Sequence, residues 1–170
     1  GITGLEDEKI TLDDTTLAVS VLNTLDGNTT GAVNAGTINT LTGAAAAMNT
    51  AYASSGITGL GDEAVTLTDT AGVALTLHTL DSNTSGSIDA GTVTSITGIS
   101  PTVITIYSSS GITGLGDEAI TLTGNTNVSN INSVAALTTG TLTATVTEGD
   151  MATLAGITES GNALTITITD

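Results

Sequence analysis

Gly56-Ile57-Thr58-Gly59-Leu60 lies near the middle of the sequence and repeats the opening Gly1-Ile2-Thr3-Gly4-Leu5. The same five residues return as Gly111-Ile112-Thr113-Gly114-Leu115. Each copy leads into an acidic pair and a short apolar run, which in the middle copy are Asp62-Glu63 and Val65-Thr66-Leu67. The copies start 55 residues apart both times. A fixed period of this length is typical of repeat proteins, in which each unit packs only on its neighbours.

The period indicates one continuous repeat array over residues 1–170. Its periods are 1–55, 56–110 and a divergent third, 111–170. Hydrophobic residues form 39% of the chain, yet it has no Phe, no Trp and only two Tyr. A core made of Ile, Val, Leu, Ala and Thr methyl groups is thin. Such a core favours stacked coils over a globule with a thick centre.

The charge of the chain excludes several classes of function. It carries 17 acidic residues against one basic residue, Lys9, for a formal net charge of −16. Nucleic acids and anionic lipids both require clustered cations, so neither is expected as a partner. No run of 18 apolar residues occurs, so we expect no membrane insertion. The chain has no Cys, which excludes disulfides, thiolate metal sites and a cysteine nucleophile.

Short strands and helices are expected to alternate along the chain. The segments between the strands read as helices, the first capped by Asp14 and the third by Asp69, with Gly27 ending the first. Residues 100–106 are β-branched behind Ser100-Pro101 and fit a helix or a strand. The first helix is expected to place four apolar residues on one face: Leu17, Val21, Leu22 and Leu25. Strand-like runs centre near residues 11, 39, 66, 94, 121, 143 and 166.

The alternation of strands and helices predicts a repeat solenoid of the β/α kind. Each coil would contribute a parallel strand, then a short helix or turn, then a Gly-rich bend. Thr residues would face outward on the strands and form ladders between coils. Gly4, Gly59 and Gly114 would stand at a tight corner of the bend. The alternative is an all-β solenoid or sandwich in which the helical segments are extended.

Three segments of the first period carry a family resemblance. They are Leu22–Gly31, the Thr37–Gly43 strand and the Ala-rich segment that runs to Tyr52. The chain resembles the "beta strand repeat" segments of very large bacterial surface proteins, common in marine cyanobacteria and grouped with RTX-type adhesins. The resemblance covers essentially the whole chain and implies a secreted or cell-surface structural or adhesive role without enzyme activity. The Gly-Gly-x-Gly-x-Asp nonapeptide that binds calcium in RTX proteins is absent.

Two further patterns are candidate calcium sites. Asp26 and Asn28, and one period later Asp81 and Asn83, carry D-x-N-x-x-G, which is similar to the first half of an EF-hand loop. No bidentate Glu follows at the twelfth position, and the alternative is a turn that ends a helix.

The recurring acidic pairs are the second candidate. Asp7-Glu8, Asp62-Glu63 and Asp117-Glu118 recur one period apart, and a divalent ion could bridge their coils. Our candidate ligands here are Asp62, Glu63, Asp117 and Glu118. The alternative is a solvated acidic loop that keeps the surface soluble.

No catalytic constellation is visible, so no enzyme activity is expected. The single His, His78, is interpreted as a surface residue, and no Gly-x-Ser-x-Gly elbow exists. Tyr52 and Tyr107 are in phase with the period, which favours packing over ligand stacking. The expected function is a structural repeat of an extracellular fibre, surface layer or adhesin stalk. Its expected partner is itself, head to tail, or flanking repeats of a longer chain. The alternative is a carbohydrate- or surface-binding module.

Overall fold

A computed structural model describes residues 4–168. The chain divides into two compact units. Unit 1 comprises residues 4–69, 79–90 and 111–113, and unit 2 comprises residues 70–78, 91–110 and 114–168. Each unit therefore takes residues from more than one sequence period. The opening Gly1-Ile2-Thr3 and the end of the last predicted strand, Thr169 and Asp170, lie outside the described residues.

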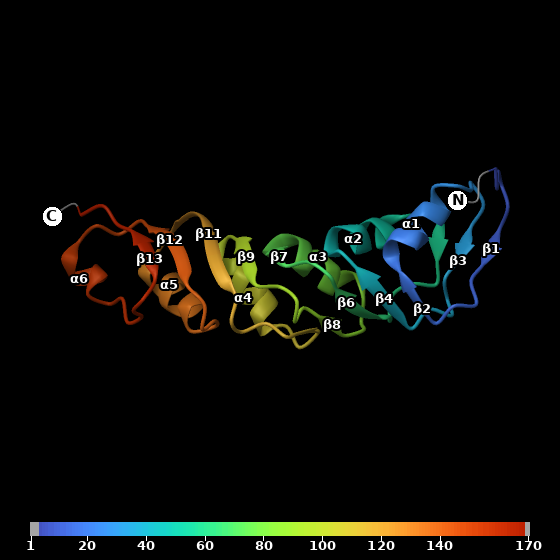
Figure 1. Cartoon of the computed structure of the whole chain (residues 1–170). Helices are drawn as coiled ribbons and strands as arrows, with labels where there is room; N and C mark the ends of the chain where they lie inside the picture. The colour runs from blue at the N-terminus through green and yellow to red at the C-terminus, as the bar shows by residue number, and fades with distance from the viewer. Residues whose placement is uncertain (1–3, 169–170) are drawn as a thin grey trace. The chain divides into compact units, whose positions relative to one another are not determined.

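Unit 1 contains two parallel sheets whose strands follow one another in chain order (Figure 1). The first sheet has the order β1-β3-β5, formed by Ile10–Thr11, Val33–Asn34 and Ile57–Thr58. The second has the order β2-β4-β6-β8-β10. Its strands are Thr16–Ala18, Thr40–Gly43, Ala64–Leu67, Ile88–Asp89 and Ile112–Thr113.

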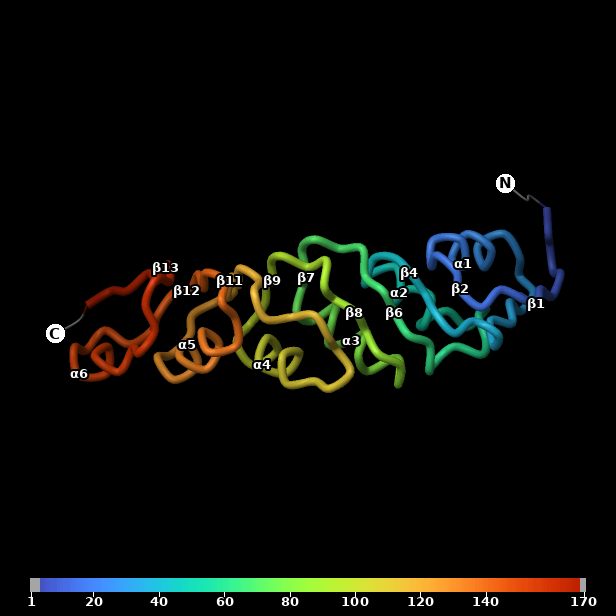
Figure 2. Tube along the Cα trace, turned by 60° about the horizontal axis from the view of Figure 1, so that its bottom comes forward, coloured from blue at the N-terminus to red at the C-terminus, as the bar shows by residue number. Residues whose placement is uncertain are grey.

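Helices connect the parallel strands of unit 1, as parallel pairing requires. They are α1 (Val19–Asp26), α2 (Ala45–Ala53) and the second half of α3 (Ala74–Asn83). α1 packs against α2, and the two lie side by side in both views (Figures 1 and 2). The core between helices and sheets is aliphatic and thin, with Leu22, Leu41 and Met48 completely buried.

Unit 2 contains one parallel sheet of order β7-β9-β11-β12-β13. The strands are Ala71–Val73, Ser95–Gly98, Ala119–Thr126, Leu142–Val146 and Ala163–Thr165. Its helices are the first half of α3, then α4 (Ser100–Ser108), α5 (Val128–Ala135) and α6 (Met151–Leu154). α4 packs against α5 as α1 does against α2 in unit 1.

The strands pair at a shorter spacing than the sequence period. Leu17 lies opposite Leu41 and Leu41 opposite Val65, 24 residues apart each time. Two such steps leave seven residues of the 55-residue period. Accordingly β7 begins at Ala71, seven residues after β6 begins at Ala64 and 55 after β2 begins at Thr16. The first period therefore supplies the first strands of two sheets, β1 and β2, and the second period supplies the first strand of the third sheet, β7.

The side chains of the strands alternate as the sequence predicts. In β12, Leu142, Ala144 and Val146 are buried and the intervening Thr residues are exposed. The predicted Thr ladder is confirmed in unit 2, where Thr97, Thr121 and Thr143 share one register. Their inward neighbours Ile96, Ile120 and Leu142 stack in the same way and are buried.

Some predicted boundaries are wrong. α1 begins at Val19, because Thr16–Ala18 pairs as strand β2, so Asp14 does not cap it. The predicted face of α1 is also wrong, since Val21 is 53% exposed while Val19 and Leu22 are buried. Asp69 does not cap α3 either: its Oδ2 accepts the N–H of Ala45 at 2.8 Å, at the start of α2.

The coarse fold prediction is confirmed: strands and helices alternate, and all three sheets are parallel. The all-β alternative is wrong, and residues 100–106 are helical. The predicted corner glycines have positive φ, +79° at Gly4, +85° at Gly59 and +84° at Gly114. A Cβ on Gly59 would collide with the backbone of Gly36, so glycine is required twice over at that corner.

Candidate functional site

The most organised polar cluster in unit 1 surrounds Glu63, which is 1% exposed. The hydroxyl of Tyr52, on α2, donates a hydrogen bond of 2.9 Å to its Oε2. The amide of Gly61 donates to both carboxylate oxygens, at 2.9 and 3.0 Å. A buried carboxylate is costly unless such donors satisfy it. We call this group, Tyr52, Gly61 and Glu63, a tyrosine–glutamate cluster.

A Thr and a Gly hold the backbone of the cluster from the next turn of the chain. The hydroxyl of Thr84 donates to the carbonyl oxygen of Glu63 at 3.0 Å, and the amide of Gly86 donates to Thr84 Oγ1 at 3.0 Å. A Cβ on Gly86 would collide with the Glu63 carbonyl. These two residues end the D-x-N-x-x-G pattern, so its last positions are explained by backbone packing.

Unit 2 contains a second tyrosine–glutamate cluster with the same partners. Glu118 is completely buried, and the Tyr107 hydroxyl donates to it at 2.5 Å. The amide of Gly116 donates to the same carboxylate. The hydroxyl of Thr138 donates to the Glu118 carbonyl at 2.6 Å, and Gly140 lies where Gly86 lies in unit 1. Two independent copies show that the cluster belongs to the repeat.

The electrostatics of both clusters keep the phenol neutral. Burial raises the pKa of Tyr52 above its ordinary value of 10.0, and the hydrogen bond to Glu63 and its charge raise it further, against a lowering contribution from Thr84. Burial and Glu118 likewise raise the pKa of Tyr107. The neutral phenol donates to the carboxylate and so offsets part of the cost of burying its charge.

The acidic pairs are thus split by the fold. Glu63 and Glu118 are buried, whereas Asp62 and Asp117 beside them are exposed. In the first period Asp7 and Glu8 are both exposed. Residue type alone does not indicate this division, because Asp and Glu are equally polar.

The other candidate calcium ligands also have protein partners. Asp26 Oδ2 accepts a hydrogen bond of 2.7 Å from Ser54 Oγ, which in turn accepts the amide of Gly56 at 3.0 Å. Asp26 thereby anchors the start of β5. Asn83 donates to Asn49 Oδ1 at 3.0 Å, and Asp81 lies half-buried on α3. Within residues 4–168, no three His, Cys, Asp or Glu side chains gather as a metal site would need. Calcium binding stays a prediction.

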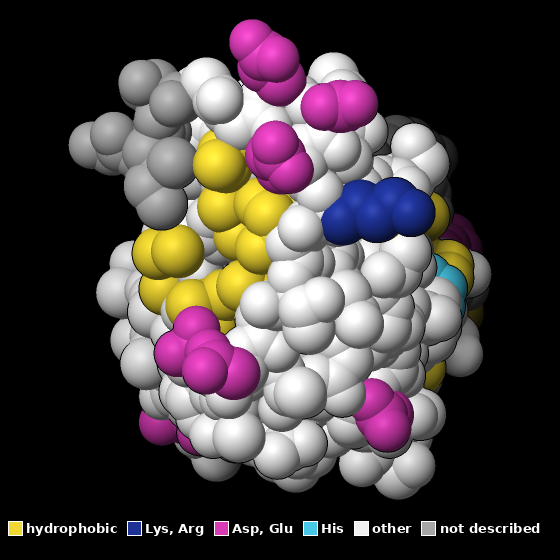
Figure 3. Space-filling view, turned by 90° about the vertical axis from the view of Figure 1, so that its right-hand side faces the viewer, with side chains coloured by type: hydrophobic (Ala, Val, Ile, Leu, Met, Phe, Trp, Pro, Cys, Tyr) yellow, Lys and Arg dark blue, Asp and Glu magenta, His cyan; other side chains and the backbone are white. Residues whose placement is uncertain are grey.

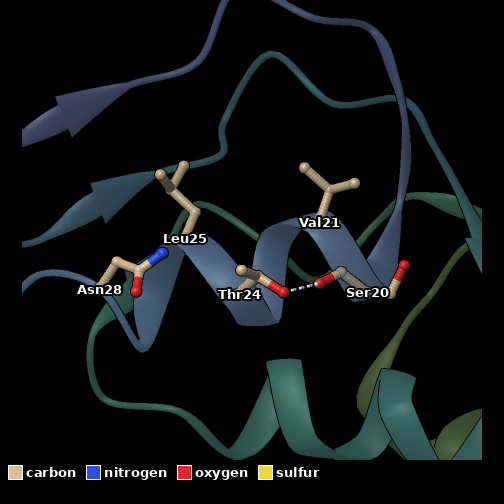
Figure 4. Close-up of a pocket in the computed structure, with 5 residues that line it drawn as sticks. All are labelled: Ser20, Val21, Thr24, Leu25 and Asn28. Atoms are coloured by element: carbon tan, nitrogen blue, oxygen red, sulfur yellow. Dashed lines mark hydrogen bonds between the residues drawn. The ribbon is translucent and has the colours of Figure 1, made fainter. Parts of the chain in front are cut away.

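Asn28 lines a shallow hollow on the outer side of α1, with Ser20, Val21, Thr24 and Leu25 (Figure 4). Thr24 Oγ1 donates to the Ser20 carbonyl at 2.7 Å, so this hydroxyl is used within the helix. Figure 3 shows apolar side chains gathered on this end of unit 1, with acidic side chains around them. The hollow itself is lined by Val21 and Leu25 together with three uncharged polar residues.

A second apolar hollow lies on unit 2. Val73, Leu75 and Ile99 line it and are 54%, 64% and 53% exposed.

His78, predicted to be a surface residue, is half-buried on α3. No helix among the described residues has the length and hydrophobicity needed to cross a membrane.

Sequence reasoning missed the tyrosine–glutamate cluster although a signal for it exists. Tyr stands eleven residues before Glu in both Tyr52–Glu63 and Tyr107–Glu118. The two Tyr residues stand one period apart, which indicated a packing role but did not show that each donates a hydrogen bond to a Glu. A spacing of eleven residues across a loop does not by itself imply a contact.

Comparison of the chain with protein-family models, with curated proteins and with solved structures gave no match.

Proposed function

We propose that this chain is a non-enzymatic structural repeat protein, a β/α solenoid that assembles end to end in an extracellular fibre, surface layer or adhesin stalk. The observation that carries the proposal is the open edges of the parallel sheets. Among the described residues, β1 and β5 pair only with β3, β2 only with β4, β10 only with β8, β7 only with β9 and β13 only with β12. An unpaired parallel edge presents backbone donors and acceptors to a further strand.

Apolar side chains accompany these open edges. In unit 1, Val21 is 53% exposed beside the half-buried Leu25. In unit 2, Met151 is 55% exposed, and Ile166 and Ile168, just past β13, are 38% and 61% exposed. Burying such residues against a neighbouring coil would contribute roughly 25 cal/mol per Å² of apolar area. Contacts of this head-to-tail kind produce filaments when they do not close.

A non-catalytic role is further supported by the repetition of the clusters. The two most buried carboxylates, Glu63 and Glu118, make the same contacts with a Tyr and a Gly in each unit. General acid–base catalysis needs an acid or base placed against a substrate, and a repeated packing contact does not by itself supply such a site. A carboxylate already occupied in duplicate fits a structural role.

Assembly is tested by sedimentation velocity and electron microscopy over a range of protein concentrations. Ile168→Lys places a charge beside the open edge and should abolish association while leaving the circular dichroism spectrum unchanged. Thr50→Lys is the control, since Thr50 is exposed on helix α2 and lines neither apolar hollow. Monodisperse particles of 16.6 kDa at every concentration would contradict the proposal.

Calcium offers a separate test of the acidic surface. With a net charge of −16, copies repel one another until salt or divalent ions screen them, over about 8 Å at physiological ionic strength. If calcium binds at Asp26 and Asn28 or at the acidic pairs, chelation lowers the melting temperature. An unchanged midpoint with and without chelator removes both metal predictions.

A further inference from the structure

Three Glu residues occupy the same position in the three periods, and one of them differs from the others. Glu63 is 1% exposed and Glu118 0%, each with a Tyr hydroxyl on its carboxylate. Glu8, 55 residues before Glu63, is exposed, and no hydrogen bond to its carboxylate is seen within residues 4–168. The first period therefore has the acceptor of the cluster without its donor.

The backbone around Glu8 already has the geometry of the complete clusters. Thr29 Oγ1 donates to the Glu8 carbonyl at 2.7 Å and receives the Gly31 amide at 2.9 Å, as Thr84 and Gly86 do around Glu63. A Cβ on Gly31 would collide with the Glu8 carbonyl, as one on Gly86 would with that of Glu63. The frame of the cluster is thus formed before any Tyr reaches it.

Apolar residues near Glu8 are incompletely buried in the same way. Ile10 and Leu12 are half-buried, whereas their counterparts one period later, Val65 and Leu67, are 1% exposed. Leu25 on α1 is half-buried as well. Its counterpart Leu80 on α3 is completely buried. Glu8, Ile10, Leu12 and Leu25 together form what we call the first-layer surface.

We propose that the first-layer surface is a docking site for a tyrosine-bearing coil of the same repeat type. The coil would lay a helix like α2 beside α1 and donate its Tyr hydroxyl to Glu8, as Tyr52 does to Glu63. This proposal rests on the proposed function, in which repeats stack on one another, and specifies the chemistry of the coil that packs on this surface.

One residue of the frame differs and must adapt. Glu6 stands where the other periods have Gly61 and Gly116, with φ of +45° against +143° and +151°. Its carbonyl still accepts the Thr30 amide, at 2.6 Å, as that of Gly61 accepts the Ser85 amide at 2.8 Å. Only the amide that would face the carboxylate is affected, so Glu6→Gly should strengthen docking.

The test tethers the partner coil to the full chain. A copy of residues 33–55 is placed directly before Gly1, which puts its Tyr eleven residues before Glu8, the spacing of Tyr52 and Glu63. Tethering supplies the coil at high effective concentration. Four variants carry either Tyr or Phe at that position of the tethered coil, each with Glu8 intact or with Glu8→Gln. A fifth combines the tethered Tyr coil with Glu6→Gly.

Docking predicts that the tethered Tyr raises the melting temperature over the tethered Phe by about 2–8 °C, the scale of one hydrogen bond in a chain of this size. Glu8→Gln should remove most of that difference, because the two residues are coupled. The added Tyr should also titrate above its ordinary value, together with Tyr52 and Tyr107.

Two results would overturn the proposal. One is equal melting of the tethered Tyr and Phe chains. The other is an added Tyr that titrates at its ordinary value, which also identifies a tethered coil that fails to fold onto the surface. The proposed end-to-end function is judged separately, by sedimentation of the native chain. Filaments of the native chain without Tyr–Glu8 coupling would support the proposed function and contradict the docking proposal. Tyr–Glu8 coupling without filaments would support docking and contradict end-to-end assembly.

Discussion

The Tyr52 hydroxyl donates a 2.9 Å hydrogen bond to the carboxylate of Glu63, a residue that is 1% exposed. Tyr52 comes from helix α2 and Glu63 from the loop before strand β6, so the bond ties one turn of the chain to the start of the next. The same tie recurs between Tyr107 and Glu118.

Removing the carboxylate should affect the three periods differently. Glu63→Gln and Glu118→Gln lose charge-assisted hydrogen bonds from a Tyr and a Gly, each worth about 1.5–3 kcal/mol. Glu8→Gln changes an exposed side chain and should alter the free energy of unfolding by less than about 0.5 kcal/mol. Urea denaturation checks all three. Equal effects at Glu8 and Glu63 would contradict the role assigned to burial.

Alkaline pH should unfold the chain as its Tyr residues ionise. The pKa of Tyr52 and Tyr107 is raised in the folded protein above 10.0, the value expected when unfolded. The folded state therefore holds more protons above pH 10, and the stability from the neutral phenols, full below pH 10, is lost as pH rises further. Tyrosinate absorbance and far-ultraviolet circular dichroism should change together. Tyrosinate formation in a chain that stays folded near pH 10 would refute the prediction.

Gly86→Ala should destabilise the chain strongly. The added Cβ would collide with the carbonyl of Glu63, and relieving such overpacking costs about 1–3 kcal/mol. Gly27→Ala is the control, because Gly27 has φ of −70° and room for a Cβ. This control should be neutral or stabilise by about 0.4–1 kcal/mol. Thermal melting distinguishes the two, and similar melting temperatures would argue against the close approach.

Asp69→Ala should weaken helix α2, which precedes it in the chain. Asp69 Oδ2 accepts the Ala45 amide at 2.8 Å, and loss of a capping acceptor costs about 0.5–2 kcal/mol. Asp14, the corresponding residue one period earlier, is exposed and caps no helix of the described chain, so Asp14→Ala should have little effect. Amide hydrogen exchange of residues 45–48 reports the difference. Unchanged exchange in Asp69→Ala would show that the cap is dispensable.

The sequence predicted that strands and helices alternate, and it predicted the approximate positions of the longer strands and helices. The period-2 pattern of Leu142 to Val146 predicted a half-buried strand, and the structure has it as β12. The segment between the strand-like runs near residues 121 and 143 was expected to be helical, and the structure has α5 there. Strands such as β2, β3 and β5 were missed because two or three residues are too few to display a period, and only their hydrogen-bonded neighbours define them.

The candidate site was predictable only in outline. The acidic pairs were predicted as candidate ligands because they recur in each period. Nothing in Asp62-Glu63 indicates that Glu63 is buried and Asp62 exposed. That difference arises when α2 brings Tyr52 over the loop and the Gly61 amide turns toward the carboxylate. Similarly, Asp69 was recognised as a helix cap but assigned to the following helix, since capping across turns of the chain leaves no local signal.

The sequence by itself determined the period, the acidic surface and the aliphatic composition of the core. These properties follow from residue identities and their spacing, which do not depend on contacts between distant residues. The tertiary structure alone decided the pairing step of 24 residues and the seven-residue offset that starts each new sheet. It also decided which Glu is buried with a Tyr and which is left on the first-layer surface. These properties depend on contacts between residues far apart in the chain, whose energy comes from burial and hydrogen bonding after the strands have paired.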